Sequence, residues 1–292
     1  MTGIRNETKS TISVVTDSAA ALSTNLISEY GLFVSRMEIT VDGKTYVDEA
    51  GDGFDDFYLR LRQAVEVPST SAPKPAEYLE QYRSAALVSK SIFCVSLSAR
   101  LSAAYDAAKV AAELLSQERP DVEIRVFDSK TAAGSQALIA MAAAQAAQDG
   151  GSLAEVESAA CVVRAKVRLL AFLDTLRFIH LSGRVPKIAV WATGVLNIKP
   201  VMEYSAGTIS TIARPRSARK ALHRIQTEMQ TDLDGKIAHV NVMHAGAPDG
   251  AEELSVWASQ NLECAKLFVT QFHPFMGAHT GPGLVGASWW AE

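Results

Sequence analysis

The sequence predicts an α/β fold in two parts, and three features of the chain lead to this expectation. Short apolar runs alternate with helical patterns through the first half, which is typical of parallel βαβ units. A strand followed by Asp-Ser and small residues occurs at both Val14 to Ala20 and Arg125 to Ala133. Beyond Gly150 the composition changes and a hairpin pattern indicates a mixed sheet. We expect an N-terminal parallel α/β domain over 1–150 and a C-terminal mixed-sheet α/β domain over 151–292. The boundary is approximate, and a later segment of the chain can return to the first domain.

The N-terminal elements follow from apolar periodicity and from the turn residues between them. Strands are expected at Ile12–Val15, Ser91–Ser96 and Glu123–Phe127, with a strand pair, Arg36–Val41 and Lys44–Val47, around Asp42-Gly43. Helices are expected at Ala20–Glu29, Phe54–Ala64, Ala76–Ala86, Leu101–Gln117 and Thr131–Ala147. Asp17 or Ser18 is placed to cap the first helix, and prolines enclose a loop from Val67 to Lys74.

The second half continues with the same two patterns. Helices are expected at Leu153–Lys166, Leu169–Ser182, Ala218–Leu233 and Ala251–Asn261. Strands are expected at Ala238–Met243 and Ala265–Val269, after a hairpin over Lys199–Ala213 that turns at Ala206-Gly207. The two tryptophans near the end, Trp289 and Trp290, are placed to close a terminal strand over the core.

Composition and charge exclude several classes of protein. The 292 residues are 48% hydrophobic and 21% charged, with a net charge of −4, so a basic nucleic-acid-binding face is not expected. The segment Met1–Ser10 is polar, unlike a signal peptide, and no apolar stretch is long enough to span a membrane. The three cysteines are far apart in apolar surroundings, which predicts buried thiols and neither a disulfide frame nor a metal site. We expect a cytoplasmic protein.

Four polar segments fall where turns of the chain are expected. They are Ser69–Pro73, Ser96–Ser102, Ser182–Val185 and His279–Gly283. Each of them alone is explained by a helix cap or a tight turn. Together they supply hydroxyls, one guanidinium and one imidazole, which suit an oxygen-rich head group such as a carboxylate. The glycines of the last segment are expected to let the backbone approach a ligand closely.

The familiar enzyme motifs are missing from this sequence. It has no phosphate-binding glycine loop, no dinucleotide fingerprint, no nucleophile elbow and no zinc-protease motif. A serine-dependent esterase or thioesterase that uses Ser98 or Ser102 with His279 remains an alternative, because such a serine needs a partnering base. A module with a closed core and no ligand is a third hypothesis.

Several of these segments together resemble one known family. Seven segments occur in the order expected of the DegV family of bacterial fatty-acid-binding proteins. They are Val15-Thr16-Asp17-Ser18-Ala19-Ala20, Thr70-Ser71-Ala72-Pro73, the run Ser98 to Tyr105, Phe127-Asp128-Ser129, Ser182-Gly183-Arg184, Ile198-Lys199-Pro200 and His279-Thr280-Gly281-Pro282-Gly283. The resemblance covers nearly the whole chain. The chain differs from the usual family pattern at Ala103 and Ala104, where glycine and threonine are common, and at Ser182, where glycine is common.

The resemblance implies a DegV-like two-domain fold with one long-chain fatty acid in a buried tunnel between the domains. It further implies a non-catalytic carrier that presents the acyl carboxylate to a separate fatty acid kinase, which makes acyl phosphate for phospholipid synthesis. No cofactor or metal is implied besides the bound fatty acid. The residues implied to bind the carboxylate are Thr70, Ser71, Ser98, Ser102, His279 and Thr280, and Arg184 supports the head group or its phosphate.

Overall fold

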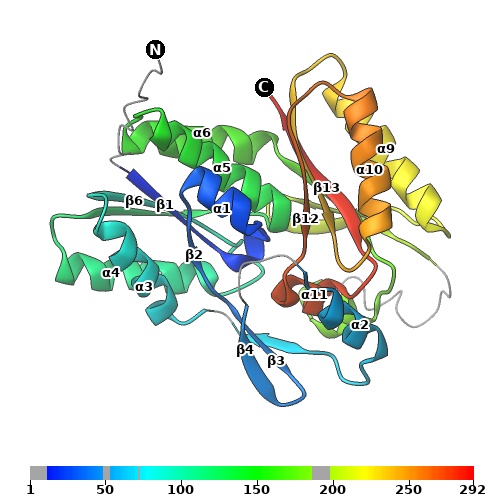
Figure 1. The fold of residues 1–292 in the computed structure, drawn as a ribbon, viewed down its shortest axis with the longest axis horizontal. Helices are drawn as coiled ribbons and strands as arrows, with labels where there is room; N and C mark the ends of the chain where they lie inside the picture. Colours follow the sequence, from blue (N-terminus) through cyan, green and yellow to red (C-terminus); the bar gives the residue numbers. More distant parts are fainter. Residues whose placement is uncertain (1–11, 49–52, 72, 186–197) are drawn as a thin grey trace, which may run out of the picture.

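A computed structural model describes residues 12–48, 53–71, 73–185 and 198–292 (Figure 1). The N-terminal segment Met1–Ser10 and the motif residue Ala72 lie outside the described residues. The first sheet has the order β2-β1-β6-β7 and is entirely parallel, as expected. Its strands are β1 (Ile12–Asp17), β2 (Phe33–Ser35), β6 (Ser91–Ser96) and β7 (Glu123–Asp128).

Helices cover both faces of this parallel sheet (Figure 1). Successive strand residues point to opposite faces, so Val14 and Phe93 pack against one helical layer while Val15 and Cys94 pack against the other. The first layer consists of α1 (Thr24–Tyr30), α5 (Ala133–Gln148) and α6 (Leu153–Lys166). The second consists of α3 (Pro75–Ala86) and α4 (Ala104–Glu118). Coverage of both faces explains why the strands are apolar on both sides.

The second sheet is mixed, which also agrees with the expectation. Its order is β10-β9-β8-β13-β11-β12, in which β11 and β12 are parallel and the other pairs are antiparallel. The strands are β8 (Arg168–Phe172), β9 (Val201–Ser205), β10 (Thr208–Ala213), β11 (Ala238–His244), β12 (Cys264–Gln271) and β13 (Val285–Ala291). The helices α9 (Ala218–Leu233) and α10 (Pro248–Asn261) cover one face. Trp289 is buried on that face, as the sequence predicts.

Helix α5 joins the two sheets. It packs against β1 of the first sheet and against β11, β13 and β8 of the second, and most of its residues are buried. Its alanines permit this close approach on all sides. Gly134 shows the tightest contact, since a Cβ there would lie 2.0 Å from Asn241 Oδ1. The expected internal alanine-rich helix is therefore confirmed, and α6, beyond residue 150, packs beside it. The division of the chain near residue 150 stays a prediction.

A small antiparallel sheet and three helices lie at the end where the two large sheets meet (Figure 1). The sheet has the order β4-β3-β5, with β3 (Glu38–Val41), β4 (Lys44–Val47) and β5 (Ser69–Ser71). The helices are α2 (Asp55–Gln63), α7 (Arg177–Leu181) and α11 (Pro274–Thr280). Contacts of α11 with α2, α7, β3 and β5 hold this group together.

Several sequence expectations about local structure are wrong. The segment Leu169–Ser182 is a strand followed by a short helix. The prediction failed because β8 is a central strand with neighbours on both sides, and its apolar run has no strand periodicity. The loop Val67–Lys74 contains β5, which pairs with β3. The first helix begins at Thr24 and is capped by Ser23, whereas Asp17 caps a single 3₁₀ turn, Ser18–Ala20.

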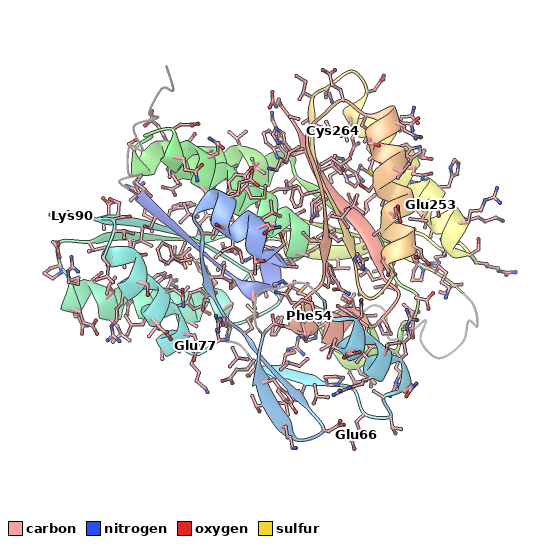
Figure 2. The ribbon with its side chains drawn as sticks, viewed as in Figure 1. Phe54, Glu66, Glu77, Lys90, Glu253 and Cys264 are labelled. Atoms are coloured by element: carbon pink, nitrogen blue, oxygen red, sulfur yellow. The ribbon has the colours of Figure 1, made fainter. Side chains whose placement is uncertain are left out.

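The cysteines are free thiols in the part of the chain that the structure describes. Cys94 is buried and its burial raises the pKa of the thiol to about 12, whereas Cys161 and Cys264 are only partly buried, contrary to expectation (Figure 2 labels Cys264). Among the described residues, no group of three or more His, Cys, Asp or Glu side chains is arranged to hold a metal ion. No helix within the described ranges is long and apolar enough to cross a membrane.

Candidate functional site

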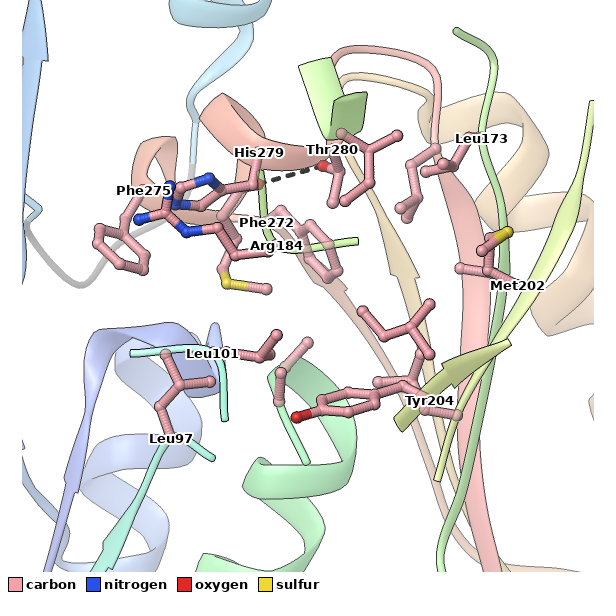
Figure 3. Close-up of a pocket in the computed structure, with 18 of the residues that line it drawn as sticks. Leu97, Leu101, Leu173, Arg184, Met202, Tyr204, Phe272, Phe275, His279 and Thr280 are labelled. Atoms are coloured by element: carbon pink, nitrogen blue, oxygen red, sulfur yellow. Dashed lines mark hydrogen bonds between the residues drawn. The ribbon is translucent and has the colours of Figure 1, made fainter. Parts of the chain in front are cut away.

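A cavity lies between the two large sheets and encloses about 950 Å³ of empty space, including the part open to solvent. The β6–α4 loop and the start of α5 form one side of it, and β8, β9, α7 and α11 form the other (Figure 3). Most of its wall is apolar, through Leu97, Leu101, Ala132, Ala133, Leu169, Ala171, Leu173, Ile179, Met202, Ile209, Phe272, Phe275, Met276 and Leu284.

A hydrogen bond between a hydroxyl and an imidazole marks the polar part of the cavity. Thr70 Oγ1 lies 2.8 Å from His279 Nε2, and these two residues are 209 positions apart in the sequence. Thr70 is the central residue of β5 and His279 lies in the last turn of α11, so contacts between these elements create the pair. The imidazole also packs edge-on against Phe275.

Arg184 lies beside His279 at the rim of the cavity (Figure 3). Its side chain is exposed, and Nη1 donates to the carbonyl of Ser182 at 2.5 Å. Burial and, to a smaller extent, the positive charge of Arg184 together lower the pKa of His279 to about 4. His279 is therefore a neutral hydrogen-bonding group near pH 7, and Arg184 supplies the positive charge.

The local structure around His279 differs from the expected tight turn. His279 and Thr280 end the helix α11, and Gly281 follows with φ of +75°. A Cβ at Gly281 would lie 2.4 Å from Phe178 Cδ2, and one at Gly283 would lie 2.5 Å from Asp174 Cβ. These two glycines therefore permit close packing against the chain around α7, and the approach of their backbone to a ligand stays a prediction.

Buried polar contacts that the sequence did not reveal hold α11 in place. Asp48 Oδ1 accepts a hydrogen bond from the backbone amide of Phe275 at 3.0 Å, and the Tyr58 hydroxyl donates to the carbonyl of Phe272 at 2.7 Å. Burial raises the pKa of Asp48 to about 7. Burial also lowers the pKa of His273 to about 4, with Nδ1 3.8 Å from Asp48 Oδ2. Neither an isolated aspartate nor a lone tyrosine forms a motif in the sequence.

Asp17 positions the opposite side of the cavity. Its carboxylate is fully buried, and Oδ2 accepts hydrogen bonds from the Leu97 amide and the Tyr78 hydroxyl, each at 2.8 Å. Oδ1 accepts from Gln136 Nε2 at 2.9 Å. Burial raises the pKa of Asp17, although these hydrogen bonds oppose the shift. The Asp-Ser motif after β1 therefore fixes the loop that carries Leu97 and Leu101 into the cavity wall.

The structure brings five of the seven expected site residues to the cavity wall, namely Thr70, Ser102, Arg184, His279 and Thr280. The other two lie outside the wall. Ser71 Oγ donates to Glu38 Oε2 at 3.2 Å on the outer side of β5, and Ser98 Oγ accepts from the Arg100 amide at 3.3 Å. The alternating directions of side chains along β5 place Thr70 inward and Ser71 outward.

The hydroxyls of the β6–α4 loop are not paired with His279 in the described structure. Ser98 Oγ is engaged within its own turn, and Ser102 Oγ accepts from the Ala104 amide at 3.2 Å at the start of α4. The base–serine contact that an esterase requires is replaced by the Thr70–His279 bond. Ala103 and Ala104, where the chain differs from the family pattern, lie at the start of α4 and outside the cavity wall.

The apolar wall from β8 was not expected, because the sequence pattern of Leu169–Phe172 indicated a helix, whereas β9 lies within the expected hairpin. In the structure Leu169, Ala171 and Leu173 line the cavity at every second position, which is the strand period. Met202 and Tyr204 repeat this period on β9. The sequence carries no such alternation, because Leu169 to Leu173 is an unbroken apolar run.

Comparison with known proteins agrees with this architecture. The family model described as "Uncharacterised protein, DegV family" matches residues 11–292. A DegV domain-containing protein of Streptomyces coelicolor is 30% identical, with 94% of this chain and 96% of that protein covered. Another from Caldanaerobacter subterraneus is 26% identical, with coverage of 94% and 97%.

Solved structures of similar fold extend over the same length. A DegV family protein from Thermus thermophilus, described by its fatty acid binding, has a TM-score of 0.87 at 24% identity, with 96% of this chain and 99% of that chain covered. A stearic acid-binding protein from Eubacterium ventriosum has a TM-score of 0.86 at 24% identity, with coverage of 96% and 98%. The match of the family model over nearly the whole chain, together with these relatives, shows that the chain belongs to the DegV family.

Proposed function

We propose that this protein binds one long-chain fatty acid in the cavity between its two sheets and presents the carboxylate to a fatty acid kinase. The observation that carries the proposal is an apolar cavity with a hydroxyl–imidazole pair and a guanidinium at its rim. An alkyl chain matches the apolar wall, and a carboxylate matches the polar groups. The fatty acid binding described for the similar Thermus thermophilus protein supports the same ligand class.

Burial of the alkyl chain supplies the driving force. Each buried methylene contributes about 0.8 kcal/mol, so a long chain gains enough to offset the entropy lost on binding. The carboxylate opposes burial, because a charge without partners is costly in an apolar environment. The rim groups remove this difficulty by leaving the head group where hydrogen-bond donors and solvent are both within reach.

The rim residues have distinct roles in this proposal. With Nε2 protonated, His279 donates to Thr70, and the hydroxyl hydrogen of Thr70 is then free to reach a carboxylate oxygen. Ser102 accepts from a backbone amide, which leaves its hydroxyl hydrogen available as a second donor. Thr280 uses its hydrogen on the Met276 carbonyl at 3.2 Å, so it forms the wall beside the head group. Arg184 provides the charge that pairs with the carboxylate.

The exposed position of Arg184 also supports a carrier that works with a second protein. A carboxylate at this rim faces outward, where a kinase that holds ATP can reach it, and the same guanidinium can pair with the phosphate of the product. In this proposal the protein works in the cytoplasm as a non-catalytic carrier, needs no cofactor or metal, and releases acyl phosphate for phospholipid synthesis.

Reconstitution with a bacterial fatty acid kinase, ATP and oleate tests the carrier function. We expect Thr70→Ala and His279→Ala to reduce acyl-phosphate formation much more than they reduce thermal stability. His223→Ala, which removes an exposed histidine on α9, is the matched control. Equal losses of product formation and of stability in the two rim variants would show that these residues are structural. Ester hydrolysis by the protein without the kinase would contradict the carrier role.

A further inference from the structure

A row of three side chains on neighbouring strands lines one side of the cavity. Leu169 of β8 pairs with Tyr204 of β9, and Tyr204 pairs in turn with Ile209 of β10. All three line the cavity. Tyr204 is the largest of them, and it is only 5% exposed.

This row lies far from the polar rim. The cavity wall includes Leu169 and Ala171 of β8 and Leu173 just after its end, and a rise of four residues in extended chain is about 13 Å. Figure 3 shows Leu173 beside Thr280 at the rim and Tyr204 on the opposite side of the cavity. An acyl chain with its carboxylate at His279 therefore extends toward the Tyr204 ring.

A second, smaller space also has Tyr204 in its wall. It encloses about 400 Å³, including the part open to solvent, and its wall includes Lys130, Thr131, Arg164 and Ser205. Tyr204 is the residue that the two walls have in common. Tyr204 therefore lies where the mainly apolar cavity and the more polar space adjoin.

We propose that Tyr204 sets the upper limit on the length of the acyl chain, an inference that rests on the proposed function. Up to the ring, each added methylene finds apolar neighbours. At the ring the chain meets a buried aromatic side chain, and the space beyond it is lined by charged and hydroxyl groups that give a methylene no gain. Affinity therefore increases with chain length until the terminal methyl reaches Tyr204, and then it stops increasing.

A series of saturated fatty acids of increasing length tests this limit, with affinities measured by displacement of a fluorescent fatty acid. Each methylene that the cavity can bury raises affinity about fourfold. We expect Tyr204→Ala to move the point where affinity stops increasing to longer chains. Ile209→Trp adds bulk in the same row at a half-buried position and should move that point to shorter chains.

Tyr46→Ala is the control, because it removes the same side chain from an exposed position on β4 and should leave the limit unchanged. The inference is overturned if folded Tyr204→Ala binds the series with the same limit as the unmodified protein, or, where Tyr204→Ala does not fold, if Ile209→Trp leaves that limit unchanged. Failure of the unmodified protein to bind any member of the series is a different result, and it contradicts the proposed function itself. Thermal denaturation of each variant identifies any that does not fold, and the remaining one then decides.

Discussion

The Thr70–His279 pair allows a direct test of how the carboxylate is held. If His279 acts by orienting the Thr70 hydroxyl, loss of either side chain disrupts the same interaction with the ligand. A hydrogen bond to a charged group contributes about 1.5–3 kcal/mol. We therefore expect Thr70→Ala and His279→Ala each to weaken oleate binding by about 10- to 150-fold.

A double-mutant cycle measured by isothermal titration calorimetry separates this mechanism from two independent contacts. The double variant should bind about as weakly as either single variant, because the second substitution removes an interaction that the first has already disrupted. Losses of binding free energy that simply add would refute the coupled arrangement. Unchanged affinity in both single variants would refute the assignment of the carboxylate to this rim.

Three further predictions concern charge and packing. In urea denaturation, the free energy of unfolding of Asp48→Asn should increase relative to that of the unmodified protein as pH increases from about 4 to 7. The folded protein keeps Asp48 protonated up to its raised pKa of about 7, whereas the unfolded chain releases this proton near pH 4, so the unmodified protein loses stability over that interval. A constant difference across pH would contradict this. Arg184→Ala removes a positive charge and should raise the pKa of His279 from about 4, although burial still holds this pKa below 6.5. An NMR titration of the imidazole measures the shift, and an unchanged pKa would contradict the assignment. Gly134→Ala should destabilise the fold by about 1–3 kcal/mol, since overpacking against Asn241 exceeds the gain in helix propensity, and an unchanged denaturation midpoint would count against the close packing of α5.

The sequence predicted helices and strands correctly where the pattern of apolar residues matches the faces that each element buries in the fold. The parallel strands, the mixed second sheet and helices such as Ala218–Leu233 follow from periodicity and turn residues, because each is an ordinary strand or an amphipathic helix. The central strand β8 was missed, since burial on both faces removes the alternation that identifies a strand. The short strand β5 was missed because its hydrogen bonds are made with β3, about 30 residues away in the sequence.

The candidate site could be anticipated only in part, for a similar reason. Hydroxyls, an arginine and a histidine in turn-forming segments indicated a polar head group, and Thr70 and His279 do meet in the structure. Which of two adjacent hydroxyls points inward depends on the strand that contains them, so composition and spacing do not separate Ser71 from Thr70, and the preference for Thr70 comes from the family pattern alone. The anchoring contacts of Asp48 and Tyr58 with α11 join segments more than 200 residues apart and have no local pattern.

Mass spectrometry of the lipid extracted from purified protein tests fatty acid binding most directly. The protein should be expressed in bacteria, extracted with organic solvent and compared with a control that was denatured and washed free of lipid. We expect one long-chain fatty acid per chain in the native sample and none in the control. Native protein that contains no fatty acid, and that also fails to bind added oleate or palmitate, would contradict the proposed function.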